Sequence, residues 1–465
     1  MSGSKLFVVA SIFVGTCAVL AASGFRGRQT VVGVDLGTTY SVIGVNEGGK
    51  VTIIPGPDGN PLLPSVVSFL DDGLVKVGHD AVQYLESDPA STIYGAKRFI
   101  GRAFFDDAVS EEGAEHLFKL VPIDEDLSGA FFELKRSGHP DSVSPQTVGS
   151  HVLRHLLKWA AGYLGHTQVN KVVIAVPAKF DARQRGATVE AFRLAGLQVI
   201  RTLEEPTAAA LAFGLHRKPS VNHILVYDLG GGTLDVSVLF VNDGSVEVIG
   251  SDGDDNLGGS DFDQCVAHVL ANKLEGRLVA LEDASDAISC HFDSPTCALH
   301  NLYPLSEGMR RQLTESQMSN IRCMILSGDK SADTQQRNLR SEATETSFAE
   351  PTDGRLMGTK TAAHNPSQNG GEDCGLWDSW TLELSRTEYE EQCTTLFSRG
   401  LAPVSRLLDR LDLTVGDVDE VVMVGGMTRT PRVRELLKEH LGVDRLNVEI
   451  DPDVVVAYGA ATVAH

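Results

Sequence analysis

The sequence predicts an α/β protein with mostly parallel sheets covered by helices. From residue 30 onwards, short runs rich in Val and Ile alternate with segments whose apolar residues recur at helical spacing. Such alternation is typical of sheets that are covered on both faces. A strand, a glycine turn and a second strand near residue 35 are followed by a similar strand–turn–strand pattern near residue 228.

Length and charge exclude several classes of protein. The chain has 465 residues, of which 42% are hydrophobic, so neither a small disulfide scaffold nor a fully disordered chain fits. Its formal charge is −22, from 40 Lys and Arg against 62 Asp and Glu. Because phosphate-backbone binding depends on Lys and Arg, nucleic acid is not an expected partner.

The N-terminal segment is predicted to be a targeting sequence. Residues 6–25 carry no charge and end in small residues before Arg26. We interpret residues 1–24 as a signal peptide with a small-residue cleavage site. An uncleaved anchor is the alternative, since about 20 apolar residues can span a bilayer, and would be the one route to membrane contact.

Elements of the first half follow from local patterns. Runs of β-branched residues predict strands over 31–34, 42–45, 51–54 and 66–69. Helical spacing predicts a helix over 148–164. A near-continuous apolar strand over 171–176 is stopped by Pro177, and a helix over 183–195, a strand over 199–203 and a helix over 206–215 follow.

The second half begins in the same way. Strands are predicted over 223–227, 234–241 and 245–249, and a helix over 262–274. Residues 328–379 are too polar to offset their ordering entropy, so we predict a disordered insertion there. A strand over 380–384, a helix over 386–411, a strand over 420–424 and a helix over 431–440 complete the chain.

Seven cysteines leave two alternatives open. Cys17 lies in the targeting segment and the other six lie after residue 264. No Cys-x-x-Cys pair is present, so a zinc site is not expected. Disulfides in an oxidising lumen and free buried thiols both fit the spacing.

The repeated turns predict phosphate and metal binding. Asp35 precedes Gly37, Thr38, Thr39 and Tyr40, and Asp228 precedes Gly230, Gly231, Gly232, Thr233 and Asp235. Glycines let backbone amides approach phosphate oxygens, and carboxylates at strand ends suit Mg²⁺. One such turn is also an ordinary β-hairpin turn, but two of them favour a clamp on one triphosphate. A third turn, Gly425–Gly426, permits close approach of a base or ribose.

On these motifs the chain resembles the actin-like ATPases, and within them the 70-kilodalton heat-shock chaperones, including their microsomal branch. Segments 32–41, 92–101, 172–215, 226–237, 421–431 and 451–460 carry the resemblance. It implies ribonuclease H-like duplicated lobes around a nucleotide cleft: lobe I over 30–218 and lobe II over 219–465, with the C-terminal segment packing back toward lobe I. No peptide-binding domain is expected.

Residue roles follow from this resemblance. Residues 37–40 and 230–233 would hold the phosphates of ATP or ADP, and Asp35 and Asp228 would hold Mg²⁺ through its waters. Lys97 would face the γ-phosphate and orient the attacking water, against the alternative of a surface salt bridge. Glu205 and Asp235 would arrange the metal's water shell or bind a monovalent cation such as K⁺. The nucleotide site would also include Ser327, Gly425, Gly426, Arg429 and Asp453.

Two departures from the family pattern concern the residues expected to bind the adenosine part of ATP. The best match to the family's charged adenosine helix is 320–327, where only Ser327 agrees, and Met427 replaces a serine. Lost charged hydrogen bonds cost about 1.5–3 kcal/mol each, so weaker ATP binding is expected.

Two functions are therefore expected for this chain, which the resemblance places in the endoplasmic reticulum lumen or microsomes, or among secreted proteins. The first is a slow Mg²⁺-dependent ATPase that needs no peptide. The alternative is a nucleotide-gated adaptor with little turnover, which binds nucleotide-exchange factors, co-chaperones or ubiquitin-like proteins.

Overall fold

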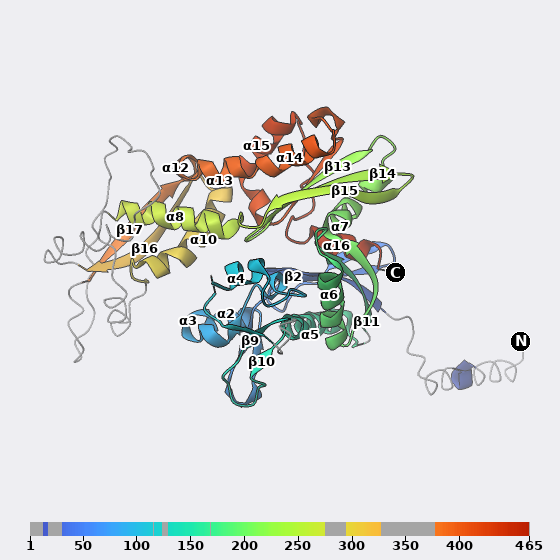
Figure 1. Cartoon of the computed structure of the whole chain (residues 1–465), viewed down its shortest axis with the longest axis horizontal. Helices are drawn as coiled ribbons and strands as arrows, with labels where there is room; N and C mark the ends of the chain where they lie inside the picture. The colour runs from blue at the N-terminus through green and yellow to red at the C-terminus, as the bar shows by residue number, and fades with distance from the viewer. Residues whose placement is uncertain are drawn as a thin grey trace, which may run out of the picture. The chain divides into compact units, whose positions relative to one another are not determined.

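The computed structural model describes residues 13–16, 30–114, 116–122, 129–167, 169–274, 294–326 and 377–464. They belong to two compact units. The first comprises Met1–Val226, Ser237–Ser251 and Asn447–His465, and the second comprises Tyr227–Val236 and Asp252–Leu446. Figure 1 shows the chain and labels many of its helices and strands.

The central sheet of the first unit combines parallel and antiparallel pairs. Its order is β12–β11–β1–β2–β3, with β4 also paired to β2. β1 is parallel to β11 and antiparallel to β2, as a strand–turn–strand start requires. The strands are β1 (Thr30–Leu36), β2 (Tyr40–Glu47), β3 (Lys50–Ile53), β4 (Leu63–Pro64), β11 (Val169–Val176) and β12 (Gln198–Glu204).

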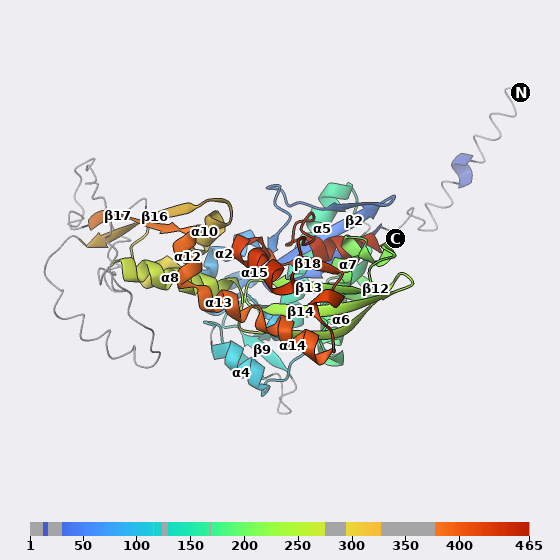
Figure 2. The same ribbon diagram turned by 90° about the horizontal axis from the view of Figure 1, so that it is seen from above.

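Helices cover both faces of this sheet because side chains alternate along each strand. Val32 and Val34 belong to the core cluster that contains residues of α5 (Pro145–Leu164) and α6 (Ala182–Leu194). Val173 instead packs against Ala460 of α16 (Val455–Thr462), with Val31 beside it. Figure 2 shows the same elements from above.

The first unit also contains smaller elements. Two three-stranded sheets have the orders β6–β5–β7 and β10–β9–β8. The elements are β5 (Val67–Phe69), β6 (Val75–Val77), β7 (Thr92–Ile93), β8 (Leu120–Pro122), β9 (Ala130–Glu133), β10 (Ser142–Val143), α2 (His79–Val82), α3 (Tyr84–Ser87), α4 (Asp107–Ala114), α7 (Glu205–Ala212) and the short 3₁₀ helix η3 (Ala96–Arg98).

The second glycine hairpin is formed by β13 and β14. These two strands belong to a four-stranded sheet of order β15–β14–β13–β18. Residues 237–251 of β14 and β15 belong to the first unit, and the two-stranded antiparallel sheet β16–β17 lies in the second. The elements are β13 (His223–Leu229), β14 (Leu234–Asn242), β15 (Ser245–Asp254), β16 (Met318–Leu326), β17 (Trp377–Ser385), β18 (Glu420–Val424), α8 (Gly259–Lys273), α10 (Leu299–Glu315), α12 (Arg386–Gln392), α13 (Thr394–Arg399), α14 (Ala402–Arg410) and α15 (Pro431–Leu441).

Some predicted boundaries were wrong. The single helix expected over 386–411 is three helices, α12, α13 and α14. Pro403 in the first turn of α14 explains one break, since proline has no amide hydrogen for a continuous helix. Residues 377–379 belong to β17 rather than to the predicted insertion, whose other residues lie outside the described part of the chain.

The predicted targeting segment is described only at residues 13–16, which are helical. Across the described ranges, no helix has both the length and the apolar character needed to cross a bilayer. The choice between signal peptide and anchor stays a prediction.

Candidate functional site

The first glycine turn is a tight hairpin between β1 and β2. A Cβ on Gly37 would lie 2.0 Å from the Tyr40 carbonyl oxygen, so only glycine fits this turn. The backbone N–H of Ser65 donates to the Thr39 carbonyl at 2.8 Å, and its hydroxyl donates to the Gly37 carbonyl at 2.8 Å. The turn is therefore held by Ser65, which directly follows β4.

Asp35, Lys97 and Glu205 come together in the first unit although they lie far apart in sequence. Asp35 is at the end of β1, Lys97 lies in η3 and Glu205 begins α7. The Lys97 Nζ donates to the Glu205 Oε1 at 2.6 Å, and their side chains are only 11% and 15% exposed. Lys97 thus makes a largely buried ion pair, unlike a solvated surface lysine.

The Asp35 carboxyl lies in an unusual electrostatic environment. Burial raises its pKa to about 7, Lys97 opposes this rise and Glu205 adds to it. Its Oδ1 is buried and has no hydrogen-bond partner among the described residues. A buried carboxylate oxygen without a donor is costly unless a ligand or ion supplies one.

This arrangement fits a magnesium ion that keeps most of its waters. In the described residues no three His, Cys, Asp or Glu side chains are grouped to hold a metal by themselves. Mg²⁺ usually binds one or two carboxylates together with phosphates and waters. The Asp35 Oδ1 is an oxygen ligand of the kind such an ion takes.

The second glycine turn, between β13 and β14, is braced by a helix. The Gly230 N–H donates to the Thr233 carbonyl at 3.0 Å, which closes the turn. The N–H groups of Gly259 and Ser260, in the first turn of α8, donate to the carbonyls of Gly230 and Gly231 at 3.0 and 2.8 Å. The turn's conformation is thereby fixed by the start of α8.

The third glycine turn lies directly beside Asp228, because Gly425 has no side chain to keep the two segments apart. Gly425 has a positive φ of 81°, and a Cβ there would lie 2.4 Å from the Leu229 carbonyl oxygen and 2.8 Å from the Asp228 Oδ1. Asp228 is the second-last residue of β13, which neighbours β18 in the sheet. Gly426 and Arg429 lie in the 3₁₀ helix η7 (Gly426–Arg429) that follows.

The remaining predicted residues are distributed over both units. Asp235 lies in β14 of the second unit. Asp453 lies before α16 in the first unit, where its N–H donates to the Asp451 Oδ1 at 3.0 Å. Ser327 lies outside the described residues.

The segment matched to the charged adenosine helix was wrongly chosen. Residues 318–326 form strand β16, which pairs in register with β17. The preceding helix α10 instead carries Glu307, Arg310 and Arg311, followed by Leu313 and Thr314. This order of charges matches the expected helix better, so missing charges at 320–327 are no longer a reason to expect weaker ATP binding. The signal available in the sequence was Glu-x-x-Arg-Arg, spaced to share one helix face.

The two arginines of α10 have different surroundings. Arg310 is 7% exposed, and its Nε and Nη2 donate to the two carboxylate oxygens of Asp263 at 2.6 and 3.2 Å. Its Nη1 donates to the Met427 Sδ at 2.9 Å. Burial raises the pKa of Asp263, although Arg310 opposes the rise. Arg311 is exposed and pairs with Glu307 at 2.6 Å.

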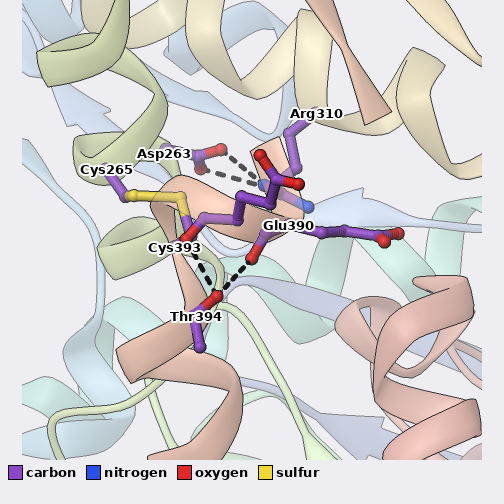
Figure 3. Close-up of a disulfide and its surroundings, with 7 residues drawn as sticks. Asp263, Cys265, Arg310, Glu390, Cys393 and Thr394 are labelled. Carbon is purple, nitrogen blue, oxygen red and sulfur yellow. Dashed lines mark hydrogen bonds and ion pairs between the residues drawn. A yellow bond between two sulfur atoms is a disulfide. The ribbon is translucent and has the colours of Figure 1, made fainter. Parts of the chain in front are cut away.

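Among the described residues of the second unit, four cysteines form two disulfides, so for these four the alternative of free thiols is wrong. Cys265 of α8 pairs with Cys393, which separates α12 from α13, and Cys297 pairs with Cys323 of β16. Figure 3 shows Cys265–Cys393 close to the Asp263–Arg310 pair. Asp263 and Cys265 are two positions apart on α8.

Comparisons with known proteins agree with one another. The sequence profile of the family described as "Hsp70 protein" matches residues 31–344 and 368–465. Heat shock 70 kDa protein 13 of Bos taurus is 36% identical over 433 residues, 93% of this chain and 87% of that protein. The Homo sapiens protein of the same name is 36% identical over 441 residues with the same coverage. Chaperone protein DnaK of Prochlorococcus marinus (strain MIT 9515) is 36% identical over 435 residues, 93% of this chain and 58% of that protein.

Proposed function

Because the chain belongs to the Hsp70 family, which has the actin-like ATPase fold, we propose that it is a slow Mg²⁺-dependent ATP phosphohydrolase. The observation that carries this proposal is the environment of Asp35. A buried carboxylate oxygen without a donor lies at the end of a strand that leads into the Gly37 turn. A divalent cation bound to nucleotide phosphates would satisfy it.

The chain's own residues would supply positioning and charge. Phosphoryl transfer needs oriented groups and charge stabilisation more than covalent help. Backbone amides of 37–40 and 230–233 would bind phosphates, and Asp35 and Asp228 would hold the metal's waters. Lys97 would orient the attacking water, with its ammonium held in place by Glu205. When bound, Mg²⁺ would neutralise charge on the phosphates.

Other residues have less direct roles in this proposal. Asp235 would order the water shell or take part in binding K⁺. Gly425, Gly426, Arg429 and Asp453 would contact the nucleoside, as would Glu307, Arg310 and Arg311 of α10. The charges of α10 support ordinary rather than weakened ATP affinity.

A steady-state ATPase assay with Mg²⁺ tests the proposal, with Lys97→Ala as the control and calorimetric titration of ATP alongside. We expect turnover that Lys97→Ala abolishes while ATP still binds. Addition of an unfolded peptide tests whether turnover is independent of peptide. Bound ATP without any Lys97-dependent turnover would overturn the ATPase and favour the adaptor, with exchange factors, co-chaperones or ubiquitin-like proteins as partners.

The proposed compartment is the lumen of the endoplasmic reticulum. The signal-like segment at residues 1–24 supports it, and so do two disulfides, since disulfides persist in oxidising compartments. Protease digestion of intact microsomes tests it: a protected chain is expected, and complete digestion without detergent would contradict a luminal location.

A further inference from the structure

The turn that carries Lys97 is held by side chains outside the predicted site. Gly95 begins it with a positive φ of 64°, and Ala96–Arg98 form η3. Tyr94 precedes the turn and Phe99 follows it. Lys97 points to Glu205, whereas its neighbour Arg98 donates to the Glu112 Oε2 of α4 at 2.8 Å. Neighbouring side chains of one turn are thus bound to two different helices.

His116 contacts this turn at several points. Its ring lies edge-on to Tyr94, with centroids 4.7 Å apart, and edge-on to Phe99 at 5.7 Å. A Cβ on Gly95 would lie 3.8 Å from the same ring. Phe118 stacks on its other side at 4.6 Å, so the imidazole is fixed between aromatic neighbours.

Glu112 binds both Arg98 and His116, and so links these two side chains in one network. Its Oε1 bonds the His116 Nε2 at 3.0 Å while its Oε2 accepts from Arg98. The Glu112 side chain is 16% exposed and that of His116 is 8% exposed. Burial tends to raise the pKa of Glu112, but His116 and Arg98 outweigh it and lower this pKa. The carboxylate therefore stays charged at neutral pH and keeps both partners.

We infer that Glu112 and His116 are positioning residues that fix the Gly95–Arg98 turn and thereby aim the Lys97 ammonium. The inference rests on the proposed function for the role of Lys97 in hydrolysis. It does not depend on that function for the placement of the turn. Since small displacements of a positioned group cost about 10- to 100-fold in rate, loss of the network should lower kcat.

The test compares Glu112→Ala with Glu111→Ala, an exposed position one residue earlier on the same helix. The first readout is modification of Lys97 by an amine-reactive reagent, measured by mass spectrometry relative to the exposed Lys158. We expect Glu112→Ala to raise Lys97 labelling severalfold and Glu111→Ala to leave it unchanged. Equal labelling in both variants would overturn the inference, whether or not the protein hydrolyses ATP.

The second readout is ATP turnover. Glu112→Ala should lower kcat by about 10- to 100-fold with little change in KM, whereas Glu111→Ala should leave both unchanged. An equal loss of kcat in both variants would contradict an action through the Glu112 network. Increased labelling without any wild-type turnover would support the positioning role and refute the ATPase. If Glu112→Ala does not fold, Glu112→Gln and His116→Asn provide the same labelling comparison.

Discussion

Cys265 and Cys393 form a disulfide across 128 positions of sequence, whereas Cys297 and Cys323 are only 26 positions apart. The longer loop contains α10, β16, β17 and α12. Because a crosslink mainly restricts the unfolded chain, the larger loop should give the larger stabilisation.

Replacement of each pair by serine tests this relationship. Removal of Cys265–Cys393 should cost about 2–5 kcal/mol of unfolding free energy, and by loop entropy about 1.4 kcal/mol more than removal of Cys297–Cys323. Urea unfolding of the two double variants measures the difference. A greater loss for the 26-position pair would show that loop length does not govern the effect.

Asp35→Asn should separate stability from activity. Without its buried charge the first unit should unfold at a higher temperature, because desolvation already penalises this carboxylate. ATP turnover should fall by about 10²–10³-fold, the size seen when one charge-stabilising group is lost. Calorimetric unfolding and the ATPase assay together check this, and a destabilised, active variant would contradict it.

Binding of Mg²⁺ with ADP should weaken as pH falls from 8 to 6. The raised pKa of Asp35, about 7, means that the carboxyl takes up a proton in this range and loses its charge. The same raised pKa also affects folding. Between about pH 7 and the ordinary aspartate range, folded Asp35 holds a proton that the unfolded chain does not, so its contribution to the free energy of unfolding grows as pH falls. Titrations of Mg²⁺ at fixed ADP measure the first effect, with Asp35→Asn as the pH-insensitive control.

Arg310→Ala and Arg311→Ala form a matched pair on α10. Loss of Arg310 leaves Asp263 buried without its partner and should cost about 3–5 kcal/mol in stability. Loss of Arg311 breaks an exposed pair with Glu307 and should cost less than about 1 kcal/mol. Chemical unfolding separates the two, and equal costs would mean that burial of Arg310 does not matter.

Gly33→Ala tests the packing of α16 on β1. A Cβ at residue 33 would lie 2.1 Å from the Ala461 backbone nitrogen, so the strand and helix would have to separate. The variant should be destabilised by more than about 2 kcal/mol, since overpacking typically costs 1–3 kcal/mol and backbone cannot yield like a side chain. Gly162→Ala in α5 meets no atom within 4 Å and should instead stabilise by about 0.5–1 kcal/mol.

Local patterns explain what could be predicted and what was missed. Val and Ile runs around Asp35 and Asp228 correctly indicated the two hairpins, because both the strands and their glycine turns are set by residues close in sequence. The adenosine helix was misplaced because the Leu-Ser ending was matched instead of the charge spacing, and alternating apolar residues in 318–326 favour a strand. Pro403 is a local signal for the start of a new helix, because proline is favoured in the first turn of a helix and disfavoured further along it.

The sequence by itself determined the α/β class, the two glycine hairpins with their carboxylates, and the family, since each depends on short contiguous motifs. Three pairings were decided only by the tertiary structure. Lys97 pairs with Glu205, the buried Arg310 pairs with Asp263, and Cys265 is joined to Cys393. Those partners lie 108, 47 and 128 positions apart. No local preference encodes such contacts, because they form only when packing brings distant elements together.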